Sequence, residues 1–505
     1  MAQSRLSAFY FAGLLLASST FASGQETTQV PHLEWTDAKR SVTAEVDRLG
    51  ERLTAASTEI WQHAELALRE SKSSALLANT LEEGGFQLER GVAEMPTAWV
   101  ASYGEGKPVV AFLAEFDALP GLSQTVSAKV EARIPGAGGH GCGHNLFGVG
   151  SVGAGLALKK AMQDNNLPGT IRVYGTPAEE QGIGKVWMVR DGMFDDVDVC
   201  LSWHPSNANE VSLTPSKALR SFEVTFYGRS AHAAGAPWSG VSALDAVEAF
   251  ETGVNLLREH MPESARIHYV VTNGGAAPNI VPSQASVWLF TRGKDWPEQE
   301  LVYRHVMKIV EGADLMAWGE EHGQAESGFQ PAYVQNLTGL YHYNPNLPAA
   351  IQMYANLALV GPAEYTEADH VFARELQTAF KIEAQGMHTE LTPFDPNAAP
   401  EPGGSTDVAN ISWVCPTIGL GVANWPMDVP AHSWASTAAS GSPAAFKAML
   451  VASKVLACAG VDVLTNPKLV ADAHSAFEKS SATFPYVSPV GADEHPSLPS
   501  SMRGE

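Results

Sequence analysis

Cysteine is scarce in this sequence: 505 residues include only four, Cys142, Cys200, Cys415 and Cys458. Four cysteines spread over a chain of this length do not form a disulfide framework. The sequence leaves open one disulfide bond between two of the residues Cys200, Cys415 and Cys458. Cys142 stands apart because histidines flank it.

Basic residues are also few, with 32 Lys and Arg against 55 Asp and Glu, which gives a formal net charge of −23. A chain of this charge repels nucleic acids and anionic membranes at long range. Both are therefore excluded as partners, although acidity says nothing about the fold.

Long apolar runs are missing after the N-terminus. Residues 1–24 contain the parts of a signal peptide: Arg5, the apolar run "LSAFYFAGLLLA" and the small residues "SSTFASG". We expect this segment to be removed and the protein to be exported, either periplasmic or secreted; an uncleaved anchor is the alternative. No later window has about 18 consecutive apolar residues, so we expect no membrane span in the mature form.

The order of predicted elements indicates an α/β fold with more than one domain, because 505 residues are too many for one core. Helical periodicity over 35–66 is followed by buried strand patterns alternating with helices. The sheet should be mostly parallel and flanked by helices. We assign a catalytic domain to 30–212 and 341–475, an inserted α+β domain to 213–340, and a disordered tail to 480–505.

Polar residues follow several of the predicted strands. Asp117, the pair Glu179–Glu180 and His204 each lie at or just past a strand's carboxyl end, and the loop 140–144 and His432 belong to the same edge. In an open α/β sheet these ends line one crevice, where ligands bind.

The residues at this edge have the chemistry of metal ligands. A thiolate, a carboxylate and three imidazoles suit zinc or a similar divalent ion. Five ligands exceed one tetrahedral site, so two ions about 3.5–4 Å apart would accommodate them. The predicted ligands are Cys142, His144, Glu180, His204 and His432. Taken singly, a histidine before proline such as His204 is more often a structural turn residue, His140 is explained by a hydrogen bond to the backbone, and a solvated loop is the default for the glutamate pair.

The chain resembles metallopeptidase family twenty over about 35–460. The resemblance is carried by the stretches "AEFDALPG", "GHGCGHN", "GTPAEE", "SWHP", "GRSAHAA", "APNIVP", "GSTDVANISW" and "PAHSW" in this order. The amidohydrolase branch of the family, which includes an aminobenzoyl-glutamate hydrolase, is the most similar. This branch commonly has Asp where the chain has Asn145, but its aminobenzoyl-glutamate side does not.

The resemblance implies the ligand set named above for two divalent ions, zinc or manganese and alternatively cobalt, with Cys142 as the bridge. It also implies that Glu179 is the general base for a metal-activated water. His232 of the inserted domain would reach the active site of a partner subunit in a homodimer, or in a heterodimer with a homologous subunit. Asn279 and Arg292 would grip the free carboxylate of the substrate, although a polar network at a strand end explains them equally well.

The implied activity is hydrolysis of the amide bond in small N-acyl amino acids, with an aromatic acyl group, of the aminobenzoyl-glutamate type. A metallo-dipeptidase or carboxypeptidase of the same family is the alternative. Outside this class, we consider an inactive member that binds a metal or a partner, and a redox or metal-storage protein built on Cys142. Two roles are open for Trp203, Trp238, Trp425 and Trp434. They line a pocket for the acyl group, or they belong to the hydrophobic core.

Overall fold

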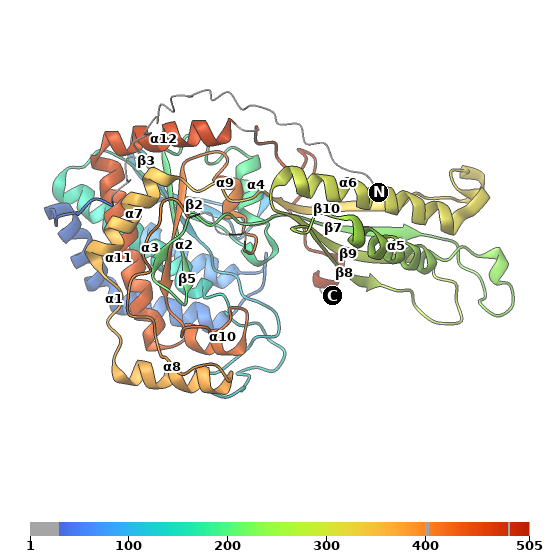
Figure 1. Ribbon diagram of the computed structural model, residues 1–505, viewed down its shortest axis with the longest axis horizontal. Coiled ribbons are helices and arrows are strands. Elements are labelled where there is room, and N and C mark those ends of the chain that lie inside the picture. Colours follow the sequence, from blue (N-terminus) through green and yellow to red (C-terminus); the bar gives the residue numbers. More distant parts are fainter. Residues whose placement is uncertain (1–29, 399–400, 402, 483–484, 504–505) are drawn as a thin grey trace, which may run out of the picture.

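The protein is built on two β-sheets that lie side by side (Figure 1). The computed structural model describes residues 30–503, apart from 399–400, 402 and 483–484. The predicted signal peptide therefore lies outside the described residues.

The larger sheet has seven strands in the order β1-β2-β4-β3-β5-β11-β6. Its four inner strands are mutually parallel, and the outer strands pair antiparallel. Every residue of β3 is buried, as its continuous apolar sequence predicts. The strands are β1 (Gln87–Arg90), β2 (Trp99–Glu105), β3 (Val109–Ala114), β4 (Gly169–Gly175), β5 (Val199–Ser206), β6 (Glu210–Val211) and β11 (Thr417–Ala423).

Helices flank this sheet, and three of them, α1, α3 and α11, pack against one another. The first begins at Thr36, whose side chain accepts a hydrogen bond from the Lys39 N–H, and its buried residues recur with helical spacing. The helices are α1 (Asp37–His63), α2 (Ser71–Glu83), α3 (His144–Asn165), α4 (Gly184–Arg190), α7 (Leu347–Val360), α8 (Glu367–Ala379), α9 (Val408–Ile411), α10 (Trp434–Ser440), α11 (Pro443–Thr465) and α12 (Pro467–Ser481).

The second sheet is antiparallel, in the order β10-β7-β9-β8, and α5 and α6 pack against it. It has a hydrophobic core of its own, which includes Phe222, Phe250 and Val306. Its elements are β7 (Ala218–Tyr227), α5 (Ala243–Leu257), β8 (Arg266–Asn273), β9 (Gln284–Gly293), α6 (Trp296–Trp318) and β10 (Tyr333–Leu340). Figure 1 shows this unit extending away from the larger sheet.

Helix α11 is apolar because it is a core helix. By length and composition it is the one helix among the described residues that could cross a membrane. However, 78% of its most apolar window is buried, and it packs against α1, α3 and β5. Its hydrophobicity is therefore explained by packing in the protein interior.

The α/β fold with a parallel central region is confirmed, but the prediction of a disordered tail is wrong for 485–503. Val490 and Leu498 are buried. Glu494 accepts hydrogen bonds from Arg190 of α4 through its carbonyl (2.7 Å) and from Asn336 of β10 through its carboxylate (3.0 Å). The segment has little periodicity because it joins two preformed surfaces rather than forming a regular element.

The open question about a disulfide also has an answer. All four cysteines are free and buried. Three of them, Cys200, Cys415 and Cys458, belong to the main hydrophobic core. There they act as small apolar side chains.

Candidate active site

The loop that carries Cys142 approaches its neighbours closely because of its glycines. A Cβ on Gly139 would lie 2.0 Å from the Leu122 carbonyl oxygen. Gly143 has φ = +77°, and a Cβ there would lie 2.8 Å from Pro205. Only glycine fits such positions at low cost. The alternating glycines therefore bring Cys142 against the end of β5.

Two further segments enter the site through strained backbone. Ala178, which precedes the glutamate pair after β4, has φ = +57°, and His432 has the same φ in the loop after β11. The Ala178 N–H donates a hydrogen bond of 2.9 Å to the buried carboxylate of Glu70. Non-glycine residues in this region cost free energy and are held by their surroundings, often at functional sites.

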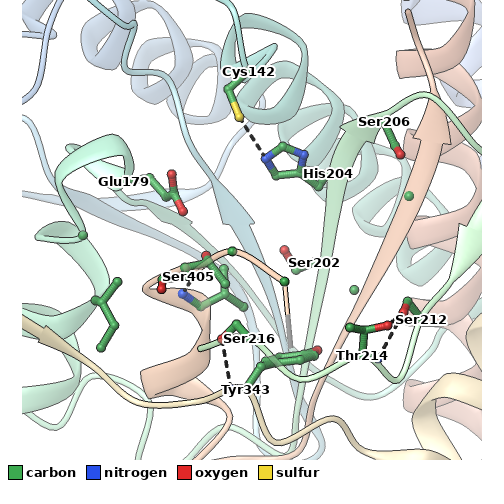
Figure 2. Close-up of a pocket in the computed structure, with 18 of the residues that line it drawn as sticks. Cys142, Glu179, Ser202, His204, Ser206, Ser212, Thr214, Ser216, Tyr343 and Ser405 are labelled. Carbon is green, nitrogen blue, oxygen red and sulfur yellow. Dashed lines mark hydrogen bonds between the residues drawn. The ribbon is translucent and has the colours of Figure 1, made fainter. Parts of the chain in front are cut away.

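The five predicted ligands are brought together, and Cys142 lies between two groups of them. One group is Cys142, His144 and His204, and the other is Cys142, Glu180 and His432; within each, the candidate ligand atoms lie within 4.8 Å of one another. The Cys142 Sγ is 3.5 Å from His204 Nε2 (Figure 2). The His432 Nε2 is 3.5 Å from a Glu180 carboxylate oxygen.

Buried atoms in this cluster lack hydrogen-bond partners among the described residues. They include Oε1 of Glu180, and Nε2 of His144, which makes no hydrogen bond but lies 3.1 Å from a Glu115 carboxylate oxygen. Leaving such groups unpaired in the interior is costly. A cation coordinated by these atoms would satisfy them, so the residues present fit a metal centre.

The protonation of the cluster also suits metal binding. Burial and the nearby His144 lower the pKa of His204 to about 4, so its imidazole is neutral near pH 7. Burial and the neighbouring carboxylates raise the pKa of Glu180, and burial with the Glu180 carboxylate raises that of the Cys142 thiol. Both groups need a nearby cation to ionise, so metal binding should release protons.

Asp117 orients two of the predicted ligands. One of its oxygens lies 2.9 Å from His144 Nδ1, and the other accepts a hydrogen bond of 2.9 Å from the Glu180 N–H. The sequence placed Asp117 at a strand end, but we did not predict it as a site residue. The sequence signal that could have identified it is its position directly after a buried strand, at the same sheet edge as the loop that contains His140 and His144.

Glu115 is a site residue that sequence reasoning missed entirely. It lies two positions before Asp117 in the segment that follows β3, and its carboxylate is 3.1 Å from His144 Nε2. Burial raises its pKa to about 8, although Lys185, 2.8 Å away, opposes this. Lys185 also pairs with Asp407 at 2.6 Å. The metal-ligand cluster is thus backed by a buried ionic network.

A cavity of about 530 Å³ opens in front of the cluster and reaches the inserted unit. Figure 2 shows Glu179 facing this space across from Cys142 and His204, with Ser202, Ser212, Ser216 and Tyr343 around it. The cavity residues that were predicted from the sequence to be functional are Cys142, Glu179, Glu180, His204, Arg292 and His432.

Arg292 lies at the cavity without a counter-ion. The described residues give its guanidinium no ion pair or hydrogen bond, and its Nε is buried and unpaired. Burial lowers its pKa. An unpaired guanidinium beside a cavity is suited to bind a carboxylate through two parallel hydrogen bonds, in a bidentate pair.

His232 and Asn279 do not line this cavity. Both are exposed on the inserted unit, next to each other, because the Ala233 N–H donates to the Asn279 carbonyl (3.1 Å) and His232 bridges to Ile280. Within a single chain they are therefore separated from the cluster.

Most of the remaining candidates lie away from the cavity. Among the four tryptophans, only Trp203 lines the cavity; Trp425 and Trp434 belong to a small apolar cluster, and Trp238 is 81% exposed. The His140 ring is within hydrogen-bond distance, 3.1 Å, of the Ile60 carbonyl. The interpretation of His140 as a backbone-bonded residue is thus confirmed.

Asn145 is held by the fold rather than by the cluster. Its side-chain amide donates hydrogen bonds of 3.0 Å to the Ser57 hydroxyl and to the Ser440 carbonyl. The Ser440 carbonyl can only accept a hydrogen bond, so an amide, which donates, suits this position where a carboxylate would be repelled.

Known proteins resemble the chain over most of its length. It is 36% identical to one of the subunits of p-aminobenzoyl-glutamate hydrolase from Escherichia coli, over 90% of this chain and 97% of the relative. It is 30% identical to the Xaa-Arg dipeptidase of Mus musculus, over 87% and 92%.

Solved structures support the fold. An aminobenzoyl-glutamate utilization protein from Klebsiella pneumoniae matches with a TM-score of 0.56 at 19% identity, over 84% of this chain and 98% of that one. A dinuclear metal-binding peptidase of the M20 family from Bacillus subtilis matches with a TM-score of 0.51 at 20% identity, over 83% and 99%.

The model of peptidase family M20/M25/M40 matches residues 111–492. This range contains all five predicted metal ligands. The chain therefore belongs to peptidase family M20/M25/M40 and is a metal-dependent hydrolase that acts on amide bonds.

Proposed function

We propose that this protein is a dinuclear metal-dependent amidohydrolase that cleaves N-acyl amino acids, with an aromatic acyl group as in aminobenzoyl-glutamate. The observation that carries the proposal is the cavity itself. It holds a metal-ligand cluster centred on Cys142 at one place and the unpaired guanidinium of Arg292 at another. An amide with a free carboxylate nearby matches both features.

The ligand arrangement supports two ions with Cys142 shared between them. His144 and His204 would hold one ion, and Glu180 and His432 the other. When bound, zinc, manganese or cobalt would act as a Lewis acid toward the amide carbonyl and would make water more acidic.

Glu179 is the proposed general base. Its side chain is 11% exposed and faces the cavity (Figure 2), so it can reach a water molecule at the cluster. It would take a proton from that water and deliver it to the leaving nitrogen. Arg292 would meanwhile hold the substrate carboxylate and so fix the amide against the cluster.

We further propose that the enzyme works as a dimer joined through the inserted unit. His232 and Asn279 lie together on one exposed patch, so both would enter a partner's cavity as a pair. The edge strand β8 exposes Val270 and Val271, which suits pairing with another chain. His232 would then stabilise the developing negative charge on the carbonyl oxygen.

The partner can be a second copy or a homologous subunit. Relatives of this chain are named as two different subunits of p-aminobenzoyl-glutamate hydrolase, which supports the second arrangement. Analytical ultracentrifugation of the purified chain separates the two cases: a stable dimer supports the first, and a monomer supports the second.

The activity is tested with a panel of N-acyl amino acids and free dipeptides, each assayed with added zinc, manganese or cobalt. We expect metal-dependent release of the amino acid from aromatic N-acyl substrates. Hydrolysis of free dipeptides alone would instead support the dipeptidase alternative, and no hydrolysis with any metal would contradict the proposal. Export rests on residues 1–24, and N-terminal sequencing of the mature protein tests it.

A further inference from the structure

The cavity holds a second charged side chain without a partner, the carboxylate of Glu210. Glu210 lies in the short edge strand β6 and lines the same cavity as the ligand cluster. It is partly buried. Within the described part of the chain, its carboxylate takes part in no hydrogen bond or ion pair.

Strand register places Glu210 beside the cluster. On the larger sheet, Gly421 of β11 is paired with His204 of β5 on one side and with Glu210 of β6 on the other. Residues paired across neighbouring strands point to the same face of the sheet. His204 and Glu210 therefore face the cavity together, about 10 Å apart between their Cα atoms, which is two strand spacings.

Strand β11 lies between them and has glycines, which lack side chains, at positions 419 and 421 on this face. A Cβ on Gly421 would lie 3.2 Å from Cγ of Glu210. The Glu210 side chain therefore lies next to the space that a side chain at position 421 would occupy. A Cβ on Gly419, two residues earlier, would meet nothing within 4 Å. No side chain of β11 therefore stands at positions 419 and 421, between His204 and Glu210.

We propose that Glu210 binds an amine on the acyl part of the substrate, so that the enzyme selects amino-substituted acyl groups. The proposal rests on the function proposed above and deepens it. The amide would lie at the cluster, the carboxylate of the amino acid at Arg292, and the acyl group over Gly419 and Gly421 toward Glu210.

A carboxylate at position 210 would favour acyl groups that carry an N–H donor and disfavour the others. An N–H donor on the substrate would give it a charge-assisted hydrogen bond, which is stronger than a neutral one. An acyl group without a donor would cover the carboxylate and leave it unpaired, and an anionic acyl group would be repelled. Discrimination of about tenfold or more is expected from such a contact.

Two chemical sources of the amine fit this description, an aromatic amine and the α-amine of an aminoacyl group. Two substrate pairs distinguish them, and the members of each pair differ only by the presence of the amine. The first pair is p-aminobenzoyl-glutamate and benzoyl-glutamate. The second is glycyl-glutamate and N-acetyl-glutamate. The ratio of kcat/KM within each pair measures the recognition of that amine.

The experiment measures these ratios for wild-type metal-loaded enzyme and for Glu210→Gln and Glu210→Leu. We expect a wild-type ratio of about ten or more in one pair, a smaller ratio for the Gln variant, which keeps a neutral acceptor, and a ratio near one for the Leu variant. Glu105→Gln, at an exposed carboxylate of β2, controls for the change in net charge. Metal content is measured for every variant.

The outcomes separate this proposal from the function on which it rests. Wild-type ratios near one in both pairs, or ratios that the Glu210 variants leave unchanged, overturn the role of Glu210 while the hydrolase activity stands. Loss of metal in Glu210→Gln would make the residue a ligand and would also overturn it. If wild-type enzyme cleaves none of the four compounds, the proposed function fails as well.

Discussion

His144 Nδ1 lies 2.9 Å from a carboxylate oxygen of Asp117, and both side chains are fully buried. A carboxylate only accepts hydrogen bonds, so Nδ1 of His144 carries a proton and Nε2, which lies 3.1 Å from a Glu115 carboxylate oxygen, is the nitrogen left to bind a metal. This contact fixes which nitrogen can bind a metal. It links the strand β3 to the loop that begins α3.

Asp117→Asn should weaken metal binding without removing a proposed ligand. The amide keeps the shape of the side chain but loses the charge that supports His144, and such outer contacts typically contribute 10- to 100-fold in metal affinity. Titration with zinc under a competing chelator measures the change. An unchanged affinity would show that His144 needs no such support.

Glu179→Gln and Glu180→Gln should behave differently although the residues are adjacent. Glu179→Gln removes the proposed base, so turnover should fall by at least about 100-fold with the metal retained. Glu180→Gln removes a proposed ligand and should lower the metal content. Steady-state kinetics and elemental analysis of both variants provide the comparison, and full activity of Glu179→Gln would contradict the mechanism.

Cys142→Ser should lower the metal stoichiometry, because the thiol is proposed to contact both ions. In the native protein, Cys142 should resist alkylation until a chelator is added. Mass spectrometry after iodoacetamide treatment detects the label. Rapid labelling of the metal-loaded protein would indicate a free thiol.

Glu70 should make stability depend on pH. Burial, reinforced by the nearby Asp117 charge, raises its pKa to about 8, against about 4.5 ordinarily. Between these values the unfolded chain loses the proton that the folded chain keeps, so this contribution to stability is complete below pH 4.5 and is lost as the pH rises through 8. The cost is about 1.4 kcal/mol for each unit of pKa difference.

Glu70→Gln stays neutral and should not show this loss. Its amide oxygen can still accept from the Leu68 and Ala178 N–H groups, as the Glu70 Oε1 does now. Urea denaturation at pH 5 and pH 8.5 should show a smaller decrease in stability for the variant than for the wild type. Glu89→Gln, at an exposed position of β1, is the control. Equal decreases in Glu70→Gln and wild type would contradict the assignment.

His232→Ala and Glu179→Gln should complement each other in mixed dimers. Each pure homodimer should be nearly inactive, but one site of a mixed dimer has both wild-type groups. Random equal mixing should restore about a quarter of wild-type activity, since half the dimers are mixed and half of their sites are intact. No recovery, with subunit exchange shown by mass spectrometry, would place the action of His232 within its own chain.

The strand-forming residues and the ligand types could be predicted from the sequence because they depend on local pattern. The continuous apolar run of β3 and the strand patterns of the inserted unit are properties of short segments. The carboxyl-end positions of Glu180 and His204 follow from the α/β pattern, which requires parallel strands to end at one edge.

The assembly of the ligand cluster depended on tertiary structure, because its members are far apart in sequence. Glu115 resembled part of a strand, and only packing placed its carboxylate beside His144 and Lys185. Glu210 had no motif at all, and its place in the cavity arises from pairing across β11.

The class of fold, the family and the chemical types of the ligands could be read from the sequence alone, since these depend on residue identity and order. The tertiary structure decided which side chains are left without partners, such as Arg292 and Glu210, and where the C-terminal segment packs. Those properties arise from contacts between distant segments. Such contacts exist only in the folded state, and no local pattern of residues encodes which distant side chains meet.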